Sequence, residues 1–315
     1  AIPGIPAALD WLSTNYGNLD LTKTLKTAIE IAESGFNVDE RYTKATKNRQ
    51  QVMNSFSETS TIFLDNHNTA KPSFILQQKN LSQTLKLIAE YGRNGFYKGS
   101  VANELVQSVN SAGGFWTKKD LELYKIVERK PIYINFKGAK ITTAPLPSSG
   151  GLVIAQVLNI LENYPLDILN NYDGQHILIE AMRRGYNDRA VYMGDEDFVD
   201  VPVSKLLSSS YAKERSANIN LSKATKSRTM PSVTSISEEG TETTHFSIID
   251  KYGNRVAATL SINTTFGSGF VAGNTGVLLN NHMNDFVLTP NSPNIYGLVG
   301  NTKNSIEPGK RPLSS

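Results

Sequence analysis

The sequence has 315 residues, of which 39% are hydrophobic and 19% charged, a balance typical of soluble globular proteins. Its 32 basic and 29 acidic residues leave a net charge of +3, and no basic block is interleaved with aromatic residues, which argues against a nucleic-acid partner. Cysteine is absent, which excludes disulfides, a thiolate nucleophile and a zinc–thiolate site, and no run of 18 apolar residues predicts a membrane span.

The first two-thirds of the sequence predict mainly helices. Apolar residues at helical spacing predict them over 21–32, 81–89, 101–109, 152–161 and about 175–192. Asp20 is a plausible cap for the first of these helices, and Gly35 closes it. Thr117 and Asp120 predict another helix start, in which Asp120 replaces the Glu or Gln of a capping box.

Two-residue alternation and short apolar runs predict the β-strands. They are expected over 132–136, 141–144, 246–249, 256–263 and 277–279. The turn DKYGN (250–254) joins two of them into a hairpin, and the glycine-rich loop GSGFVAGNTG (267–276) precedes the last. Because the strands come as hairpins, this order favours an α/β sandwich over a doubly wound parallel sheet.

Two segments are predicted to lie in loops, and two histidines have no neighbouring residues that would form a site with them. Residues 221–242 form a polar tract without periodicity, which predicts a linker. The acidic run GDEDFVD (194–200) lacks the spacing of a calcium loop and predicts a solvated loop. His67 and His176 are isolated in the sequence, so surface or core roles are expected for both.

Thr243 stands where the polar tract runs directly into a strand, in TETTHFSII. A threonine hydroxyl is a weak nucleophile unless a base takes its proton. An α-amine, whose ordinary pKa is about 7.7 to 8.0, can be that base, but only once the preceding peptide bond has been cut. The junction therefore suits a precursor that cuts itself before Thr243, although threonine is also common in linkers and at strand starts.

The sequence resembles the γ-glutamyltranspeptidase family over nearly its whole length. The stretch TTHFSIIDKYGNRVAATLSINTTFGSGFVAGNTGVLLNNHMNDF (243–286) is similar to the start of the family's small subunit, as is YGLVG followed by PGKRPLSS (296–315). Three stretches upstream are similar to parts of the family's large subunit and occur in the same order: IPGIPAALDWLSTNYGNLDL, APLPSSGGLVIAQVLNILENY and YNDRAVYMGDEDFVDVP.

The resemblance implies a fold and a subunit organisation. The fold is an α/β fold, the αββα sandwich of the N-terminal-nucleophile hydrolases, with mainly antiparallel sheets flanked by helices. A large-subunit portion (1–242, ending in the linker 221–242) and a small-subunit portion (243–315) form one domain and, after a cut between Glu242 and Thr243, a heterodimer. No metal or cofactor is implied, and the family's bacterial members imply a periplasmic or secreted protein.

The implied reaction transfers the γ-glutamyl group of glutathione and related compounds to water, an amino acid or a peptide. It passes through a γ-glutamyl ester of Thr243. Two enzymatic alternatives keep the same nucleophile, a poly-γ-glutamate depolymerase and an acylase. A third alternative is an uncleaved, non-catalytic homologue.

The resemblance also assigns the site residues. Ser261 falls where relatives usually have a threonine that hydrogen-bonds the nucleophile. Asn263 and Asp285 match the residues that contact the α-amino group of the substrate, and Ser314 and Ser315 match the pair that binds its α-carboxylate. Tyr296 matches the tyrosine of a lid loop, here expected at 290–301.

The sequence departs from the family pattern in three places. His282 stands where relatives usually have Gln or Glu: a neutral imidazole can accept a bond from the substrate ammonium, a protonated one would repel it, and a side chain turned away would do neither. The family's carboxylate-binding arginine is expected before Ala1 and its oxyanion-hole glycines after Ser315. We therefore expect the natural protein to extend beyond both ends of this sequence.

Overall fold

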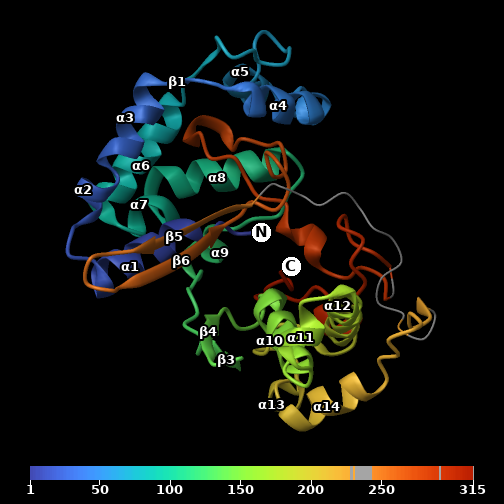
Figure 1. Ribbon diagram of the computed structural model, residues 1–315. Coiled ribbons are helices and arrows are strands. Elements are labelled where there is room, and N and C mark those ends of the chain that lie inside the picture. Colours follow the sequence, from blue (N-terminus) through green and yellow to red (C-terminus); the bar gives the residue numbers. More distant parts are fainter. Residues whose placement is uncertain (228–229, 231–242, 291, 315) are drawn as a thin grey trace. The chain divides into compact units, whose positions relative to one another are not determined.

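The computed structural model describes residues 1–227, 230, 243–290 and 292–314 (Figure 1). Glu242, Ser315 and most of the predicted linker 221–242 lie outside the described residues. The chain divides into two compact units, the first comprising Ala1–Val127 and Thr241–Asn281, the second Glu128–Gly240 and His282–Ser315. Each unit thus draws on both sides of the predicted cut.

The first unit is mainly helical. Its helices are α1 (Ile5–Tyr16), α2 (Leu21–Thr24), α3 (Lys26–Ser34), α4 (Glu40–Met53), α5 (Ser57–Phe63), α6 (Lys79–Tyr91), α7 (Asn94–Tyr97), α8 (Gly99–Ser111), α9 (Lys118–Glu122) and the 3₁₀ helix η2 (Gly273–Thr275). Its strands are β1 (Phe36–Asn37), β2 (Ile75–Leu76), β5 (Thr244–Ile249) and β6 (Arg255–Leu260). β1 pairs with β2 and β5 with β6, both antiparallel.

Two buried apolar clusters stabilise the first unit. The larger is centred on α6, α7 and α8, which are neighbours in Figure 1, and includes Phe96, Tyr97, Leu105 and Leu121. The Tyr97 hydroxyl donates a 2.6 Å hydrogen bond to the carbonyl of Pro3, so this core also holds the start of the chain. The smaller cluster gathers residues of α4 and α5 with Val271, which lies after the hairpin in the sequence.

The predicted helices of this unit are confirmed, with one difference. The capping box is present, since the Asp120 N–H donates to Thr117 Oγ1 and the Thr117 N–H donates to the Asp120 carboxylate. The segment predicted as one helix over 21–32 bends at Leu25 into α2 and α3. Thr24 Oγ1 bonds the carbonyl of Asp20, and a threonine that bonds the preceding turn often bends a helix.

The predicted strand 277–279 is wrong as a strand. The segment makes a single β-bridge, between Val271 and Leu278, and its other backbone hydrogen bonds go to the preceding loop. Glycines at positive φ interrupt the pairing on both sides, namely Gly267, Gly269, Gly273 and Gly276. Such left-handed backbone cannot continue a regular ladder.

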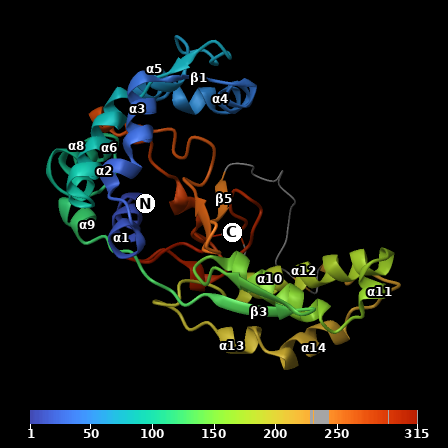
Figure 2. The same ribbon diagram turned by 60° about the vertical axis from the view of Figure 1, so that its left-hand side comes forward.

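The second unit places a hairpin and several helices around one core. Its elements are β3 (Ile132–Phe136), β4 (Ala139–Thr143), α10 (Ser149–Leu161), α11 (Leu166–Leu169), α12 (Tyr172–Tyr192), α13 (Val203–Leu206), α14 (Ser209–Ala217), η3 (His282–Asp285) and η4 (Thr302–Asn304). β3 and β4 form the predicted antiparallel hairpin, and β3 packs on α10 beside α12 (Figure 2). The core includes Leu146, Leu152, Ile160 and Ile177.

The acidic run 194–200 is the loop that was expected, with Glu196, Asp197 and Asp200 exposed, but its first acid is buried. Asp195 is fully buried, and its carboxylate accepts a 3.1 Å bond from the Arg129 guanidinium and a 2.9 Å bond from the Arg311 N–H. Arg129 also bonds Asp197 at 2.7 Å. Asp195 and Asp197 therefore hold three distant segments together, and the ion pair with Arg129 compensates for the burial of Asp195.

The glycine pair at the start of α10 offers a matched test of the packing. A Cβ at Gly151 would overlap the carbonyl oxygen of Ala144, whereas a Cβ at Gly150 would meet open space. We expect Gly151→Ala to lower the free energy of unfolding by about 1–3 kcal/mol. Gly150→Ala should raise it by up to about 1 kcal/mol, because alanine favours the helix. Denaturant unfolding of both variants checks this, and an equal effect at the two positions would contradict the close approach.

None of the helices in the described ranges is both long and apolar enough to cross a membrane.

Candidate active site

Thr243 and Ser261 face each other at the open end of the β5–β6 hairpin. The antiparallel register pairs Thr244 with Leu260, so the next pair outward is Thr243 with Ser261. Their hydroxyl oxygens are 3.2 Å apart, within hydrogen-bond distance. The predicted nucleophile and the predicted second hydroxyl are therefore in contact, and the side chain of Thr243 is exposed.

The same face of the hairpin continues as a row of polar side chains. Side chains alternate between the two faces of a strand, so Thr243, His245 and Ser247 share a face. His245 does not reach toward Thr243: its Nδ1 bonds Thr259 Oγ1 across the strands at 2.8 Å, and its Nε2 contacts Ser247 Oγ at 3.3 Å. The histidine beside the two threonines is thus engaged along the row.

Asn263 is held close to Ser261. Its backbone N–H donates to Ser261 Oγ at 3.0 Å, and its side-chain amide donates to the carbonyl of Asn281 at 3.2 Å. Asn263 is 5% exposed and has a φ of 76°, a left-handed conformation that asparagine tolerates better than most residues. Three of the predicted residues, Thr243, Ser261 and Asn263, therefore form one connected group in the first unit.

His282 and Asp285 form a second connected group, in the second unit. Both lie in the short helix η3, where the Asp285 carboxylate is 3.2 Å from His282 Nδ1. Asp285 is 7% exposed. The imidazole thus contacts the carboxylate that is expected to bind the ammonium, and a direct contact between His282 and the substrate stays a prediction.

Ser314 and Tyr296 also belong to the second unit. The backbone of Ser314 is bonded on both sides, its N–H donating to Pro147 and its carbonyl accepting from Ser149, while Ser314 itself is exposed. Tyr296 lies in a tight turn closed by a bridge between Pro293 and Val299. The predicted lid loop is thus folded locally at 293–299, and Ser315 lies outside the described residues.

Three residues that the sequence reasoning missed surround Ser314 and Asp285. Ser149 and Arg189 are buried next to Ser314, and Asn304 contacts the backbone of both segments. Ser149 belongs to the stretch APLPSSGGLVIAQVLNILENY, which was noted only for its resemblance to the family's large subunit. Nothing in the local pattern around Arg189 or Asn304 indicated a role at the site.

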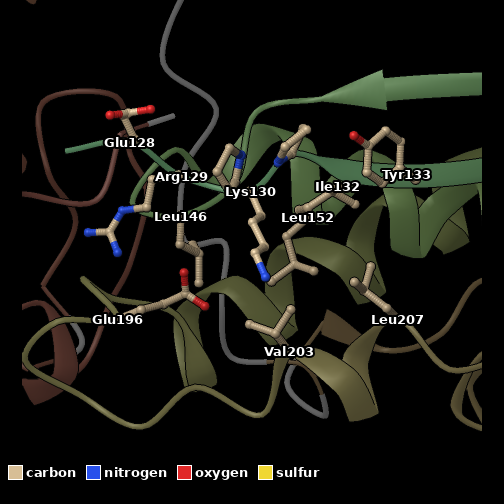
Figure 3. Close-up of a pocket in the computed structure, with 12 residues that line it drawn as sticks. Glu128, Arg129, Lys130, Ile132, Tyr133, Leu146, Leu152, Glu196, Val203 and Leu207 are labelled. Carbon is tan, nitrogen blue, oxygen red and sulfur yellow. The ribbon is translucent and has the colours of Figure 1, made fainter.

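The second unit also contains a cavity of about 490 Å³ (Figure 3). Its walls combine charged and apolar side chains, among them Glu128, Lys130, Glu196, Leu146, Leu152, Val203 and Leu207. None of the predicted site residues lines it. Across the described ranges, no three histidine, aspartate or glutamate side chains come together as a metal ion would require.

Comparison with known proteins gives a consistent match. The family model described as gamma-glutamyltranspeptidase matches residues 1–315. The chain is 40% identical to the glutathione hydrolase proenzyme of Escherichia coli (strain K12) over 99% of its own length and 54% of that relative. It thus spans about half the length of the curated relatives it matches.

Solved structures of two enzymes have a similar fold. The gamma-glutamyltranspeptidase of Helicobacter pylori matches with a TM-score of 0.71 and 35% identity, over 73% of this chain and 67% of that one. A cephalosporin acylase from Bacillus halodurans matches with a TM-score of 0.83 and 28% identity, over 100% of this chain and 56% of that one. The predicted fold class, an α/β fold of the N-terminal-nucleophile hydrolase type, is confirmed.

Proposed function

The chain belongs to the γ-glutamyltranspeptidase family, and we propose that the full-length protein is a γ-glutamyl hydrolase and transferase. Its substrates would be glutathione and related γ-glutamyl amides, with water, amino acids or peptides as acceptors. The observation that carries the proposal is the 3.2 Å contact between Thr243 Oγ1 and Ser261 Oγ at the position where the family's nucleophile is expected.

The proposed chemistry begins with a cut between Glu242 and Thr243. While that bond is intact, the nitrogen of Thr243 is an amide and cannot take a proton. After the cut, its α-amine accepts the proton of the Thr243 hydroxyl, whose oxygen attacks the γ-carbonyl of the substrate. The amide bond breaks, the leaving amine receives the proton, and water or an acceptor amine then resolves the γ-glutamyl ester.

The other residues would orient the nucleophile and the substrate. Ser261 donates to or accepts from Thr243 Oγ1, and Asn263 holds the Ser261 hydroxyl through its N–H. Asp285 would bind the α-ammonium of the substrate as a buried carboxylate. Ser314 would bind the α-carboxylate, together with Ser315, and Tyr296 would belong to a covering loop.

The subunit organisation and location belong to the same proposal. The portions 1–242 and 243–315 would stay associated as a heterodimer, because both units contain residues from each portion. A periplasmic or secreted location remains a prediction from the family.

An acylase is the second candidate, because the cephalosporin acylase structure matches the whole chain with a TM-score of 0.83. An acylase that takes a plain acyl chain has no need for a carboxylate facing an ammonium. Asp285, 7% exposed and contacting His282, therefore favours an amino-acid head group. A depolymerase of poly-γ-glutamate would share this feature at the chain end.

Three substrates separate these candidates. The purified full-length protein is offered a γ-glutamyl anilide, a glutaryl anilide that lacks only the α-amine, and a poly-γ-glutamate chain. We expect the protein to run as two fragments and to release aniline much faster from the first compound than from the second. Preference for the glutaryl compound would indicate an acylase, and shortening of the polymer alone would indicate a depolymerase. A single uncut, inactive chain would contradict all three enzymatic readings.

A further inference from the structure

Ser314 is fixed by its backbone while its side chain remains exposed. Its N–H donates to the carbonyl of Pro147 at 2.9 Å, and its own carbonyl accepts the N–H of Ser149 at 3.0 Å. The hydroxyl of Ser149 donates a second bond to the same carbonyl at 2.7 Å. The position of the Ser314 side chain thus depends on groups at the start of α10.

Arg189 determines which way the Ser149 hydroxyl points. Its Nε donates to Ser149 Oγ at 2.9 Å, and a guanidinium can only donate. Ser149 Oγ is therefore the acceptor in that bond, and its single proton is directed at the Ser314 carbonyl. Ser149 is 1% exposed and Arg189 is 4% exposed, so water does not compete for either bond.

Arg189 also lies within electrostatic reach of Asp285. Burial lowers the pKa of Arg189 to about 10, while the negative charge of Asp285 acts in the opposite direction. The guanidinium is therefore charged at neutral pH. One buried cation thus acts on both the Ser314 segment and the Asp285 carboxylate.

Asn304 links the same two segments by a second route. Its side-chain nitrogen donates to the carbonyl of Asp285 at 2.7 Å, and its side-chain oxygen accepts the N–H of Leu313 at 2.9 Å. Asn304 is 4% exposed. Both ends of one rigid amide are used, so the residue before Ser314 is held at a fixed distance from Asp285.

We propose that Ser149, Arg189 and Asn304 are positioning residues that fix Ser314 relative to Asp285 and thereby select a complete α-amino acid head group. The ammonium and the carboxylate of an α-amino acid are attached to the same carbon atom. The protein groups that bind them must therefore stay at a fixed distance from each other. This inference rests on the proposed function through the roles given to Ser314 and Asp285. The three residues would act through those two and would not touch the substrate.

The test compares two ligands that differ by one group. Binding of L-glutamate and of 4-aminobutyrate, which lacks the α-carboxylate, is measured by calorimetry on the full-length protein. Ser149→Ala removes the hydroxyl between Arg189 and Ser314. We expect it to weaken L-glutamate binding about tenfold, the size of one lost hydrogen bond, and to leave 4-aminobutyrate binding unchanged.

Ser148→Ala is the matched control, because the neighbouring Ser148 makes no side-chain hydrogen bond to the helix it precedes. It should leave both affinities as they are. If Ser149→Ala does not fold, Arg189→Lys keeps the charge, loses the Nε donor and should give the same selective loss. Equal losses for both ligands, or no loss, would overturn the inference, as would a parent protein that does not bind L-glutamate. Binding needs no turnover, so a protein that binds selectively but releases no aniline would overturn only the proposed function.

Discussion

Replacing Thr243 by alanine is expected to leave the full-length protein as a single uncut chain that releases no aniline from a γ-glutamyl anilide. The variant lacks the hydroxyl that lies 3.2 Å from Ser261 Oγ. During maturation the same oxygen would attack the carbonyl of the preceding peptide bond, which frees the α-amine and forms an ester that water hydrolyses; afterwards it would attack the substrate. Both activities should therefore disappear together, with a loss in rate of roughly 10⁴-fold or more, as for the nucleophiles of other hydrolases.

Thr244→Ala is the matched control for this prediction. Thr244 is the next residue of β5, so its side chain lies on the opposite face from that of Thr243. The control should be cut and should keep its activity within a few-fold of the parent. Intact mass measurement and sequencing of the smaller fragment, expected to read Thr-Thr-His-Phe in the parent, decide the outcome. Two fragments from Thr243→Ala would show that another residue performs the cut.

The hairpin that carries Thr243 could be predicted because its signals are local. Phe246 and Ile248 stand on either side of Ser247, Ala258 and Leu260 stand on either side of Thr259, and the turn 250–254 joins the two runs. Once the turn sets the register, Thr243 must lie opposite Ser261. The helix start at Thr117 was predictable for the same reason, since both members of its capping box lie within four residues.

Long-range pairing could not be predicted in this way. Asp195 and Arg129 are 66 positions apart. An acidic run in a sequence does not indicate which basic side chain will form an ion pair with it or which of its acids will be buried. The failed strand at 277–279 is a run of three apolar residues, as a buried strand would be, but four glycines around it adopt positive φ, which depends on the packing of the loop. Arg189 and Asn304 matter through partners on other elements, so periodicity did not distinguish them from ordinary helix and loop residues.

Asp285→Asn is expected to remove most of the preference for a γ-glutamyl group over a glutaryl group. Asparagine keeps the shape of the side chain and removes the charge proposed to face the substrate ammonium. Breaking a buried ion pair typically costs about 3–5 kcal/mol. We therefore expect kcat/KM for the γ-glutamyl anilide to fall by roughly 10²- to 10⁴-fold, while kcat/KM for the glutaryl anilide, which has no ammonium, stays within a few-fold of the parent.

His282→Gln separates the charge of Asp285 from the contact that His282 makes with it. The imidazole Nδ1 lies 3.2 Å from the Asp285 carboxylate, and a glutamine amide can hydrogen-bond the same group without ever becoming a cation. This variant should keep the preference for the γ-glutamyl compound that Asp285→Asn loses. If instead Asp285→Asn lowers kcat/KM equally for both anilides, with unchanged fragment sizes and thermal stability, then Asp285 does not bind the substrate ammonium. The choice between an amino-acid substrate and a plain acyl chain would then have to be made by other residues.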